Sequence, residues 1–303
     1  MKTESNLVTY IRKINEKFNI LETITWWPHN FVTWLKDHNY SPIELKLRQL
    51  NIPEDFKVYL PEDDKGLSSQ LRVAGLREPV NFEYYYKFIN KDDIVLDLGA
   101  NAGIFSLLSK NAKKIICVEP LPGLIPFIIK NLKTNDLDNK AIVLNMAVGE
   151  KGKLLLEIDD KMNFSRIVKK KTDKTIEVKS VPLKELAEKY KPNVVRLDVE
   201  GYEYNILYKK TPKEINKISM ELHGHLLTNK QITNMMNYFE KEGFMMRYLI
   251  ECIPDRLNPF YNILKKTGLL EKLTYVKENL TPTECLPFIF KGRAIKYLFL
   301  ERK

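Results

Sequence analysis

From Asp93 onward, short apolar runs rich in β-branched residues alternate with segments of helical periodicity. Each run is followed by turn residues, and most of them lead into a helical segment. Continuous apolar strands of this kind are typical of a parallel sheet that is covered on both faces. The pattern therefore predicts a doubly wound α/β fold. The runs are DIVLDLG (93–99), KIICVEP (114–120), AIVLNMAVG (141–149), VVRLDVEG (194–201) and KISMELHG (217–224).

Later segments extend this pattern. LLLEI followed by TIEVKSV alternates like an antiparallel hairpin, which predicts a hairpin insert near 153–181. FMMRYLI and the late AIKYLFLER supply a sixth and a seventh strand, and a mostly helical insert near 252–293 separates them. We therefore expect a seven-stranded Rossmann-like sheet within one domain that covers 71–303.

Residues 1–70 differ from the rest of the chain. The helical stretches TYIRKINEKFNILETI and NFVTWLKDH are interrupted by WWPHN and by prolines. We expect a helical amino-terminal layer that packs on the main domain through Trp26, Trp27 and Trp34. The first residues alternate charged and apolar side chains, so no signal peptide is expected. No run approaches the roughly 18 apolar residues that a membrane span requires.

Composition and charge add general limits. A chain of 303 residues, 44% of them hydrophobic, can bury a full core. Cys117, Cys252 and Cys285 are odd in number and far apart, which argues against a disulfide framework or zinc spacing and favours a cytoplasmic location. The net charge of +10 would attract polyanions such as RNA, without identifying one. The densest basic cluster, 166–174, lacks interleaved aromatic residues, so a solvated hairpin tip is the simpler interpretation.

The turn after the first strand is the place to look for a ligand, because open α/β sheets bind ligands at the carboxyl ends of their strands. A dinucleotide motif would read G-x-G-x-x-G, but Asn101 stands where its second glycine belongs, and Gly103 comes one residue early. This turn is therefore poorly suited to bind a pyrophosphate. The carboxylate of Asp97 would repel phosphate and favour a sulfonium or ammonium group. S-adenosylmethionine is a nucleoside that meets this description.

The next two strands predict contacts to such a nucleoside. Glu119 ends the second strand, where an acidic side chain typically accepts hydrogen bonds from both ribose hydroxyls. The same carboxylate is expected for NAD, so it supports a nucleoside without choosing the cofactor. The third strand ends in Asn145–Gly149, where small and apolar side chains can enclose an adenine ring.

These motifs together resemble the FkbM family of S-adenosylmethionine-dependent methyltransferases. The resemblance spans about residues 72–225 and depends on GLREPV, DLGANAG, VEP, NLKTNDL, AVG and RLDVEGYE in that order. It implies a class I methyltransferase fold with an antiparallel seventh strand, and O-methylation of small molecules or glycans. The roles that it implies are donor binding by Asp97, Gly99, Asn101 and Gly103, ribose binding by Glu119, an adenine border at Met146 and Ala147, and closure of the methionine end of the pocket by Glu78.

The end of the fourth strand faces the methyl group in a fold of this type, and here it carries two carboxylates. Side-chain alternation places Asp198 and Glu200 on the same side of the strand. We expect Asp198 to act as a general base or to accept a hydrogen bond from the substrate hydroxyl, with Glu200 as its companion. Two alternatives are a divalent metal held by this pair and a structural role in the turn.

Residues outside the fourth strand complete the predicted catalytic site. His223, at the end of the fifth strand, is well placed for a general base, although a histidine held by the backbone is an equal alternative. The motif H-x-H at His223 and His225 does not by itself make a metal site, so none is assigned. Ser165 and Arg166 of the hairpin insert could reach over the cleft toward a polar acceptor.

We therefore expect a methyltransferase that uses S-adenosylmethionine to methylate a hydroxyl of a sugar or small metabolite. The alternatives are an RNA or other nucleic-acid methyltransferase, which the charge of +10 favours, and a non-catalytic module that binds the donor. A dehydrogenase is disfavoured because the second glycine of the dinucleotide motif is missing.

Overall fold

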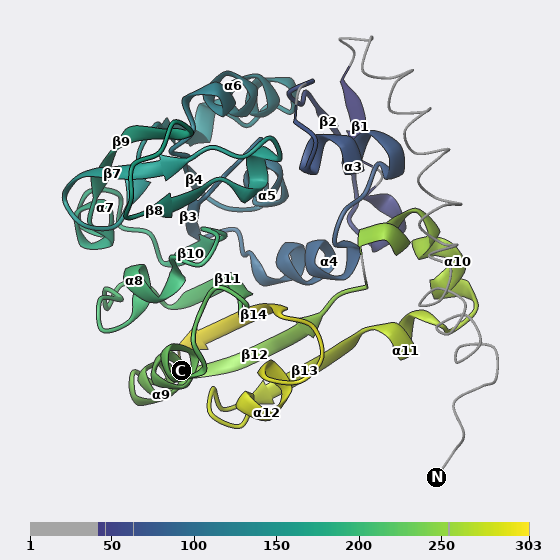
Figure 1. The fold of residues 1–303 in the computed structure, drawn as a ribbon. Coiled ribbons are helices and arrows are strands. Elements are labelled where there is room, and N and C mark those ends of the chain that lie inside the picture. Colours follow the sequence, from purple (N-terminus) through teal and green to yellow (C-terminus); the bar gives the residue numbers. More distant parts are fainter. Residues whose placement is uncertain (1–41, 46, 63, 254, 303) are drawn as a thin grey trace.

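The fold is seen in a computed structural model that describes residues 42–302 except 46, 63 and 254, and its centre is an eight-stranded mixed sheet (Figure 1). In spatial order its strands are β13 (Tyr275–Leu280), β12 (Phe244–Glu251), β14 (Ile295–Arg302), β11 (Lys217–His223), β10 (Val194–Leu197), β3 (Ile94–Leu98), β4 (Lys114–Val118) and β5 (Ala141–Leu144).

The strand order reverses at β3. Strands β3, β4, β5, β10 and β11 are parallel, and β14 runs antiparallel between β11 and β12. From β3 the chain first builds outward through β4 and β5, and then returns to the other side of β3 with β10 and β11. A reversal of this kind opens a crevice at the carboxyl ends of the two central strands, here β3 and β10.

All seven predicted strands are present, but the prediction of seven was one too few. The eighth, β13, lies in the segment expected to be mostly helical and pairs antiparallel with β12. Its charged residues suit an exposed edge of the sheet, which is why its pattern did not resemble that of a buried strand. The rest of that segment is helical in short pieces: η5 (Asp255–Phe260), α10 (Tyr261–Lys266), α11 (Leu270–Leu273) and α12 (Leu286–Ile289).

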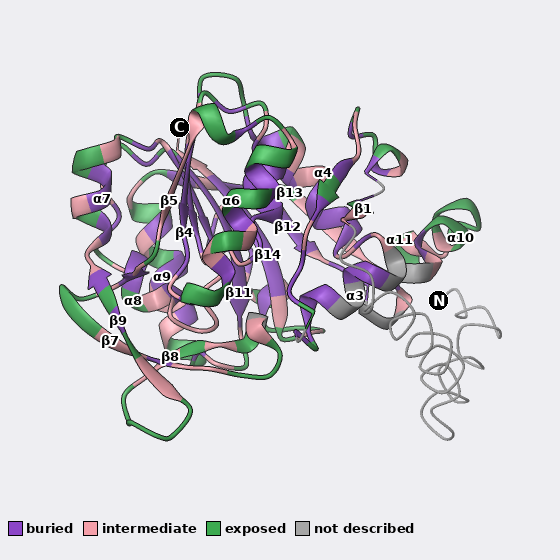
Figure 2. Ribbon diagram, turned by 90° about the horizontal axis from the view of Figure 1, so that it is seen from above, coloured by how far each residue is buried: buried purple, intermediate pink, exposed green. Residues whose placement is uncertain are grey.

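Two apolar clusters cover the two faces of the sheet. Val95 of β3 points into one cluster and Leu96 into the other, as strand alternation requires. The helices α4 (Pro79–Phe88), α5 (Ile104–Leu108) and α6 (Ile125–Thr134) pack on the first face, and α7 (Leu183–Tyr190), α8 (Glu203–Leu207) and α9 (Asn229–Lys241) pack on the second. Figure 2 shows the buried strands between helices whose outer sides are exposed. The doubly wound arrangement is confirmed.

The insert between β5 and β10 is larger than the predicted hairpin. It forms a four-stranded sheet in the order β6 (Ala147–Val148), β9 (Thr175–Val181), β7 (Gly152–Glu157) and β8 (Arg166–Val168). A short helix, η4 (Met162–Phe164), precedes β8. Two further short helices, η2 (Pro122–Leu124) and η3 (Asp138–Lys140), flank α6. This small sheet lies beside α5, over the carboxyl ends of β3 and β4 (Figure 1).

Most of the predicted helical amino-terminal layer, with Trp26, Trp27 and Trp34, lies outside the described residues. The part that is described forms an antiparallel pair, β1 (Ile43–Leu45) and β2 (Phe56–Val58), with η1 (Arg48–Leu50) between them and α3 (Leu67–Ala74) after them. Leu45 and Phe56 belong to the same apolar cluster as Val95 of the main sheet. This segment is therefore not the purely helical layer that the sequence predicts.

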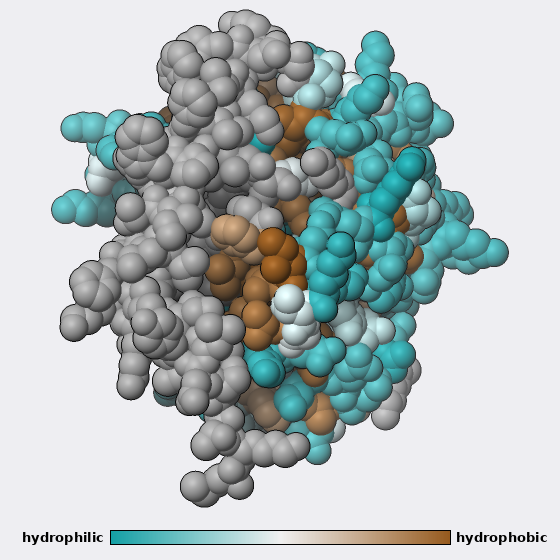
Figure 3. Space-filling view, turned by 90° about the vertical axis from the view of Figure 1, so that its right-hand side faces the viewer, coloured by the Kyte–Doolittle hydropathy of each residue, from teal (hydrophilic) through white to brown (hydrophobic). Residues whose placement is uncertain are grey.

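The surface has one face on which apolar side chains gather next to hydrophilic ones, on the right-hand side of the molecule in Figure 1 (Figure 3). Ile263 of α10 is the most exposed large apolar side chain among the described residues, at 61%. Within the part of the chain that the structure describes, no helix combines the length and the apolar character that crossing a bilayer demands.

Candidate active site

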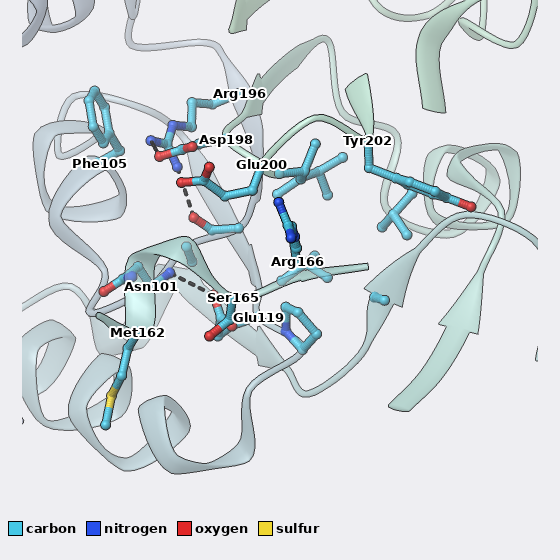
Figure 4. Close-up of a pocket in the computed structure, with 18 of the residues that line it drawn as sticks. Asn101, Phe105, Glu119, Met162, Ser165, Arg166, Arg196, Asp198, Glu200 and Tyr202 are labelled. Atoms are coloured by element: carbon cyan, nitrogen blue, oxygen red, sulfur yellow. Dashed lines mark hydrogen bonds and ion pairs between the residues drawn. The ribbon is translucent and has the colours of Figure 1, made fainter. Parts of the chain in front are cut away.

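A cleft of about 980 Å³, measured with its open mouth, lies at the carboxyl ends of β3, β4 and β10 (Figure 4). The residues lining it include most of those predicted from the sequence: Glu78, Gly99, Asn101, Glu119, Met146, Ala147, Asp198 and Glu200. Three other predicted residues, Asp97, Gly103 and His223, do not line the cleft. We call the part of the cleft near Gly99 and Glu119 the turn end, and the part near Asp198 and Glu200 the carboxylate end.

The turn end is shaped by backbone geometry. Gly99 has a φ of +77°, and a Cβ atom there would lie 1.9 Å from the main-chain oxygen of Asp198. Only glycine therefore allows β3 and β10 to approach so closely. Asn101 also has a positive φ, of 51°, which asparagine tolerates better than most residues, and its Oδ1 accepts a hydrogen bond from the N–H of Ala102 at 2.7 Å. Gly103, with a φ of +84°, is the N-cap of α5 and does not line the cleft.

Glu119 is held in the cleft by two main-chain donors. The N–H of Asn101 donates to its Oε2 and the N–H of Leu121 donates to its Oε1, each at 2.8 Å. Burial raises the pKa of this carboxyl to about 7. The side-chain amide of Asn145 donates to the carbonyl of Glu119 at 2.9 Å, which ties the end of β4 to the chain after β5. Met146 and Ala147, which follow, line the cleft beside it.

Asp97 differs from the prediction that its carboxylate faces a sulfonium. Its side chain is fully buried, with Ser106 Oγ donating to Oδ2 at 2.6 Å and Arg196 Nη1 donating to Oδ1 at 3.3 Å. Burial raises the pKa of Asp97. Arg196 compensates the charge of Asp97 inside the protein, and this arginine, unlike Asp97, lines the cleft.

Arg196 is the residue that the sequence reasoning missed. Its Nη2 donates to Asp198 Oδ2 at 2.8 Å and its Nη1 to the carbonyl of Gly99 at 2.9 Å, so it connects both ends of the cleft (Figure 4). Its guanidinium also lies 4.1 Å from the centre of the Phe105 ring. The signal was available, since a lone arginine in the apolar run VVRLD must find a carboxylate when the strand is buried.

At the carboxylate end, His223 gathers several acidic side chains. Its Nδ1 lies 2.7 Å from Glu203 Oε1, while its Nε2 lies 3.3 Å from Glu200 Oε2 and 3.5 Å from Glu221 Oε1. Asp198 Oδ1 lies 3.9 Å from the same Nε2. The structure thus brings the three predicted catalytic residues together, and adds Glu203 and Glu221 to them.

The acidic surroundings change how these groups ionise. Burial alone would lower the pKa of His223, but the hydrogen bond with Glu203 and the charges of Glu221 and Glu200 outweigh it and raise the pKa to about 10. Burial raises the pKa of Glu200 to about 7 and also raises that of Glu221. A histidine in this state carries its proton at neutral pH, which does not suit the predicted role of His223 as a general base.

Glu78 lies at the start of α4, in the left-handed region with a φ of 47°. Its Oε1 lies 2.9 Å from Arg77 Nε, and its Oε2 accepts a hydrogen bond from Asn81 at 3.1 Å. The insert also lines the cleft, through Met162 of η4, Ser165 after it and Arg166 at the start of β8. The two polar residues that we expected over the cleft therefore do line it.

A second cavity, of about 580 Å³ with its mouth, lies beside the carboxylate end. Arg77 lines both cavities, and Glu221 lines the second one. The other walls come from residues after β12 and around the start of β14: Cys252, Ile253, Arg293, Ile295 and Tyr297. Nothing in the sequence pattern indicated this cavity, because its lining residues are apolar or isolated charges in separate segments.

Comparison with known proteins places this site in a family. Residues 97–246, about half of the chain, match the Methyltransferase FkbM domain. A segment of 95 residues is 34% identical to the tRNA (guanine(37)-N(1))-methyltransferase Trm5b of Methanocaldococcus jannaschii, and it covers 30% of this chain and 27% of that protein. The chain thus matches about a quarter of the length of this curated relative.

The solved structures that align with this chain are more distant. The tRNA m1G37 methyltransferase of M. jannaschii aligns with 82% of this chain and 52% of its own, at 15% identity and a TM-score of 0.41. Trm5b of Pyrococcus abyssi aligns with 81% and 53%, at 10% identity and a TM-score of 0.42. The FkbM domain match covers the turn, Glu119 and the carboxylate cluster alike, so the chain belongs to the FkbM family of methyltransferases.

Proposed function

We propose that this methyltransferase transfers a methyl group from S-adenosylmethionine to a hydroxyl of a sugar or small metabolite. The proposal rests on one observation: the turn end and the carboxylate end lie in the same cleft. The buried carboxylate of Glu119 lies at one end, and Asp198 and Glu200 lie at the other. The first suits a ribose with two hydroxyl donors, and the second suits a hydroxyl that must lose its proton.

The family implies S-adenosylmethionine as the donor, and the turn end fits it. Glu119 presents a carboxylate held in place by two N–H groups, which suits the ribose hydroxyls. Ile104, Val118 and Met146 give the cleft apolar walls that suit an adenine ring. When bound, S-adenosylmethionine supplies a methyl group activated by its sulfonium, and the electron pair of the broken carbon–sulfur bond stays on sulfur.

The chain's own contribution to the transfer is to orient the acceptor and take its proton. Asp198 and Glu200 line the cleft and offer oxygen atoms to an acceptor hydroxyl. Arg196 holds one oxygen of Asp198, so the other is left to face His223 and the acceptor. We assign the acceptor proton to this pair, and assign to His223 the positioning of the carboxylates.

The acceptor would enter from the second cavity and from beneath the small sheet. Arg77 borders both cavities, so an acceptor in the second one would reach the carboxylate end directly. Cys252, Ile253 and Arg293 would wall it, which gives the segment 252–293 a role in acceptor binding. Ser165 and Arg166 would contact it from the other side. We propose that 71–303 works as the methyltransferase domain.

RNA is the second candidate acceptor. It is favoured by the net charge of +10 and by the 34% identity, over 95 residues, to an enzyme named for a tRNA base. The acidic side chains at the carboxylate end argue the other way, because they would repel the phosphates next to a target base. A neutral hydroxylic acceptor meets no such repulsion.

The test is transfer of labelled methyl from S-adenosylmethionine into separated RNA, protein, lipid and glycan fractions. We expect label in the glycan or small-molecule fraction, with loss of label in Glu119→Ala. Label that appears only in RNA would replace the proposal with the second candidate. Donor binding by calorimetry with no transfer to any fraction would instead indicate a module that binds the donor without catalysis.

A further inference from the structure

The carboxylate end has the geometry of a cation site. Asp198, Glu200 and His223 each offer one ligand atom, and these atoms lie within 4.8 Å of one another. The distances from His223 Nε2 to the oxygen atoms of Glu200 and Asp198 are 3.3 and 3.9 Å. Two ligands that each lie about 2.1 Å from a divalent cation, at right angles or slightly wider, are about 3.0–3.4 Å apart. Small side-chain adjustments would thus suffice for all three to bind one ion.

A fourth side chain points to the same place. Glu221 is 6% exposed, and its Oε1 lies 3.5 Å from His223 Nε2. Within the described part of the chain its carboxylate makes no hydrogen bond, and its ion pair with His223 is the one that is seen. This mostly buried carboxylate borders the second cavity, and a cation between these groups would neutralise its charge.

The histidine is already oriented for a cation. Glu203, which is fully buried, accepts from His223 Nδ1 at 2.7 Å and from the N–H of Gly201 at 3.1 Å. This fixes the ring so that Nε2 faces Glu200 and Glu221. A carboxylate behind a histidine is the usual arrangement around a metal-binding imidazole, where it selects the tautomer and holds the ring.

Charge balance favours a divalent ion over the proton alone. Four carboxylates, those of Asp198, Glu200, Glu203 and Glu221, lie within 3.9 Å of the two ring nitrogens of His223. Arg196 pairs with one of them, Asp198, and shares its charge with Asp97, while Arg77 lines the two cavities beside Glu200 and Glu221. A cation with two charges in place of the ring proton would reduce the repulsion among the remaining carboxylates.

We propose that Asp198, Glu200, Glu221 and His223 bind one divalent cation, with Glu203 as the residue that positions His223. Three carboxylates and one imidazole suit Mn²⁺ or a similar oxygen-preferring ion better than a thiophilic one. The cation would hold the acceptor hydroxyl and lower its pKa, and the Glu200 oxygen that does not bind the ion would accept the proton. Binding of the ion does not depend on the proposed function, whereas this catalytic role does.

The test uses the full chain, stripped of metal with a chelator and titrated with Mn²⁺. Loss of the electron paramagnetic resonance signal of free Mn²⁺ reports binding without any donor or acceptor. We expect one saturable site, which Glu200→Gln and Glu221→Gln each weaken at least tenfold. Glu203→Gln should weaken it by about 10–100-fold, since it disturbs the ring without removing a ligand. Glu119→Gln, a buried carboxylate at the turn end, is the matched control and should bind Mn²⁺ as the wild type does.

Circular dichroism and thermal unfolding show whether each variant folds. Glu200 is the safer substitution, because its side chain is 14% exposed and makes no hydrogen bond that the described residues show. Absence of saturable Mn²⁺ binding to the wild type would overturn the proposal, as would full binding in the folded double variant Glu200→Gln/Glu221→Gln. Mn²⁺ binding together with label only in RNA would leave the cation site standing and remove the sugar or metabolite acceptor.

Discussion

The turn end of the cleft is made mostly of main chain, whereas the carboxylate end is made of side chains from several elements. At the turn end, the backbone of residues 99–101 and the two N–H groups that donate to Glu119 form the wall. At the carboxylate end, Asp198, Glu200 and Glu203 follow β10, while Glu221 and His223 come from β11.

Under the proposed function, this difference separates the two tasks of the enzyme. A donor common to many enzymes would be bound by a turn whose shape needs only a few residue types, above all glycine. The acceptor would be bound by side chains, which can change without changing the fold. Arg196 joins the two regions, because it donates both to the carbonyl of Gly99 and to Asp198.

The largest effect is expected from Arg196→Met, which removes this connection. The change leaves Asp97 buried without its cation, and losses of that kind cost about 3–5 kcal/mol. Chemical denaturation should show this loss. Arg48→Met is the matched control, because its pair with Asp55 is on the surface and is worth about 1 kcal/mol or less. Equal losses of unfolding free energy in the two variants would mean that the buried ion pairs of Arg196 stabilise the fold no more than a surface ion pair does.

Gly99→Ala should have the next largest effect, because it tests the backbone construction of the turn end. The new Cβ would meet the main-chain oxygen of Asp198 at a strained φ, and we expect a loss of about 3 kcal/mol in stability and of donor binding. Gly123→Ala is the control, since nothing lies within 4 Å of a Cβ there. Unchanged donor affinity in Gly99→Ala, measured by calorimetry, would contradict this account.

Glu119→Gln tests the one side chain on which the turn end depends. An amide cannot accept from both main-chain N–H groups, and it also removes the charge that the ribose hydroxyls would meet. We expect S-adenosylmethionine affinity to fall about 10–100-fold, the range for hydrogen bonds to a charged group. Mn²⁺ binding at the carboxylate end should be unaffected. A parallel loss of both ligands would show that the two ends are not independent.

The smallest effect is expected from pH. The pKa of Glu119 is about 7 in the folded protein, above its ordinary 4.5, so this group favours folding below pH 4.5 and loses that contribution as pH rises through 7. Donor binding should change in the opposite direction, increasing up to about pH 8 as the carboxylate forms. Calorimetry across this range should show the increase in the wild type and not in Glu119→Gln. A wild-type donor affinity that does not change between pH 6 and 8 would contradict this prediction.

The fold was largely predictable, because buried parallel strands leave a strong local pattern. The five apolar runs became the parallel strands β3, β4, β5, β10 and β11, and the two late runs became β12 and β14. The edge strand β13 and the small sheet around β7 and β9 were missed or underestimated, since exposed strands carry mixed polar residues that resemble loops.

For the site, the turn and the family were predictable from sequence alone, because DLGANAG and RLDVEGYE combine residue types that a backbone turn and a strand end require locally. Which charged side chains meet depends on the tertiary structure. It paired Asp97 with Arg196, turned His223 toward Glu200 and Glu221, and set Arg77 between two cavities. Strand pairing brings together residues about 100 positions apart, and side-chain contacts at such distances leave no periodic signal in the chain.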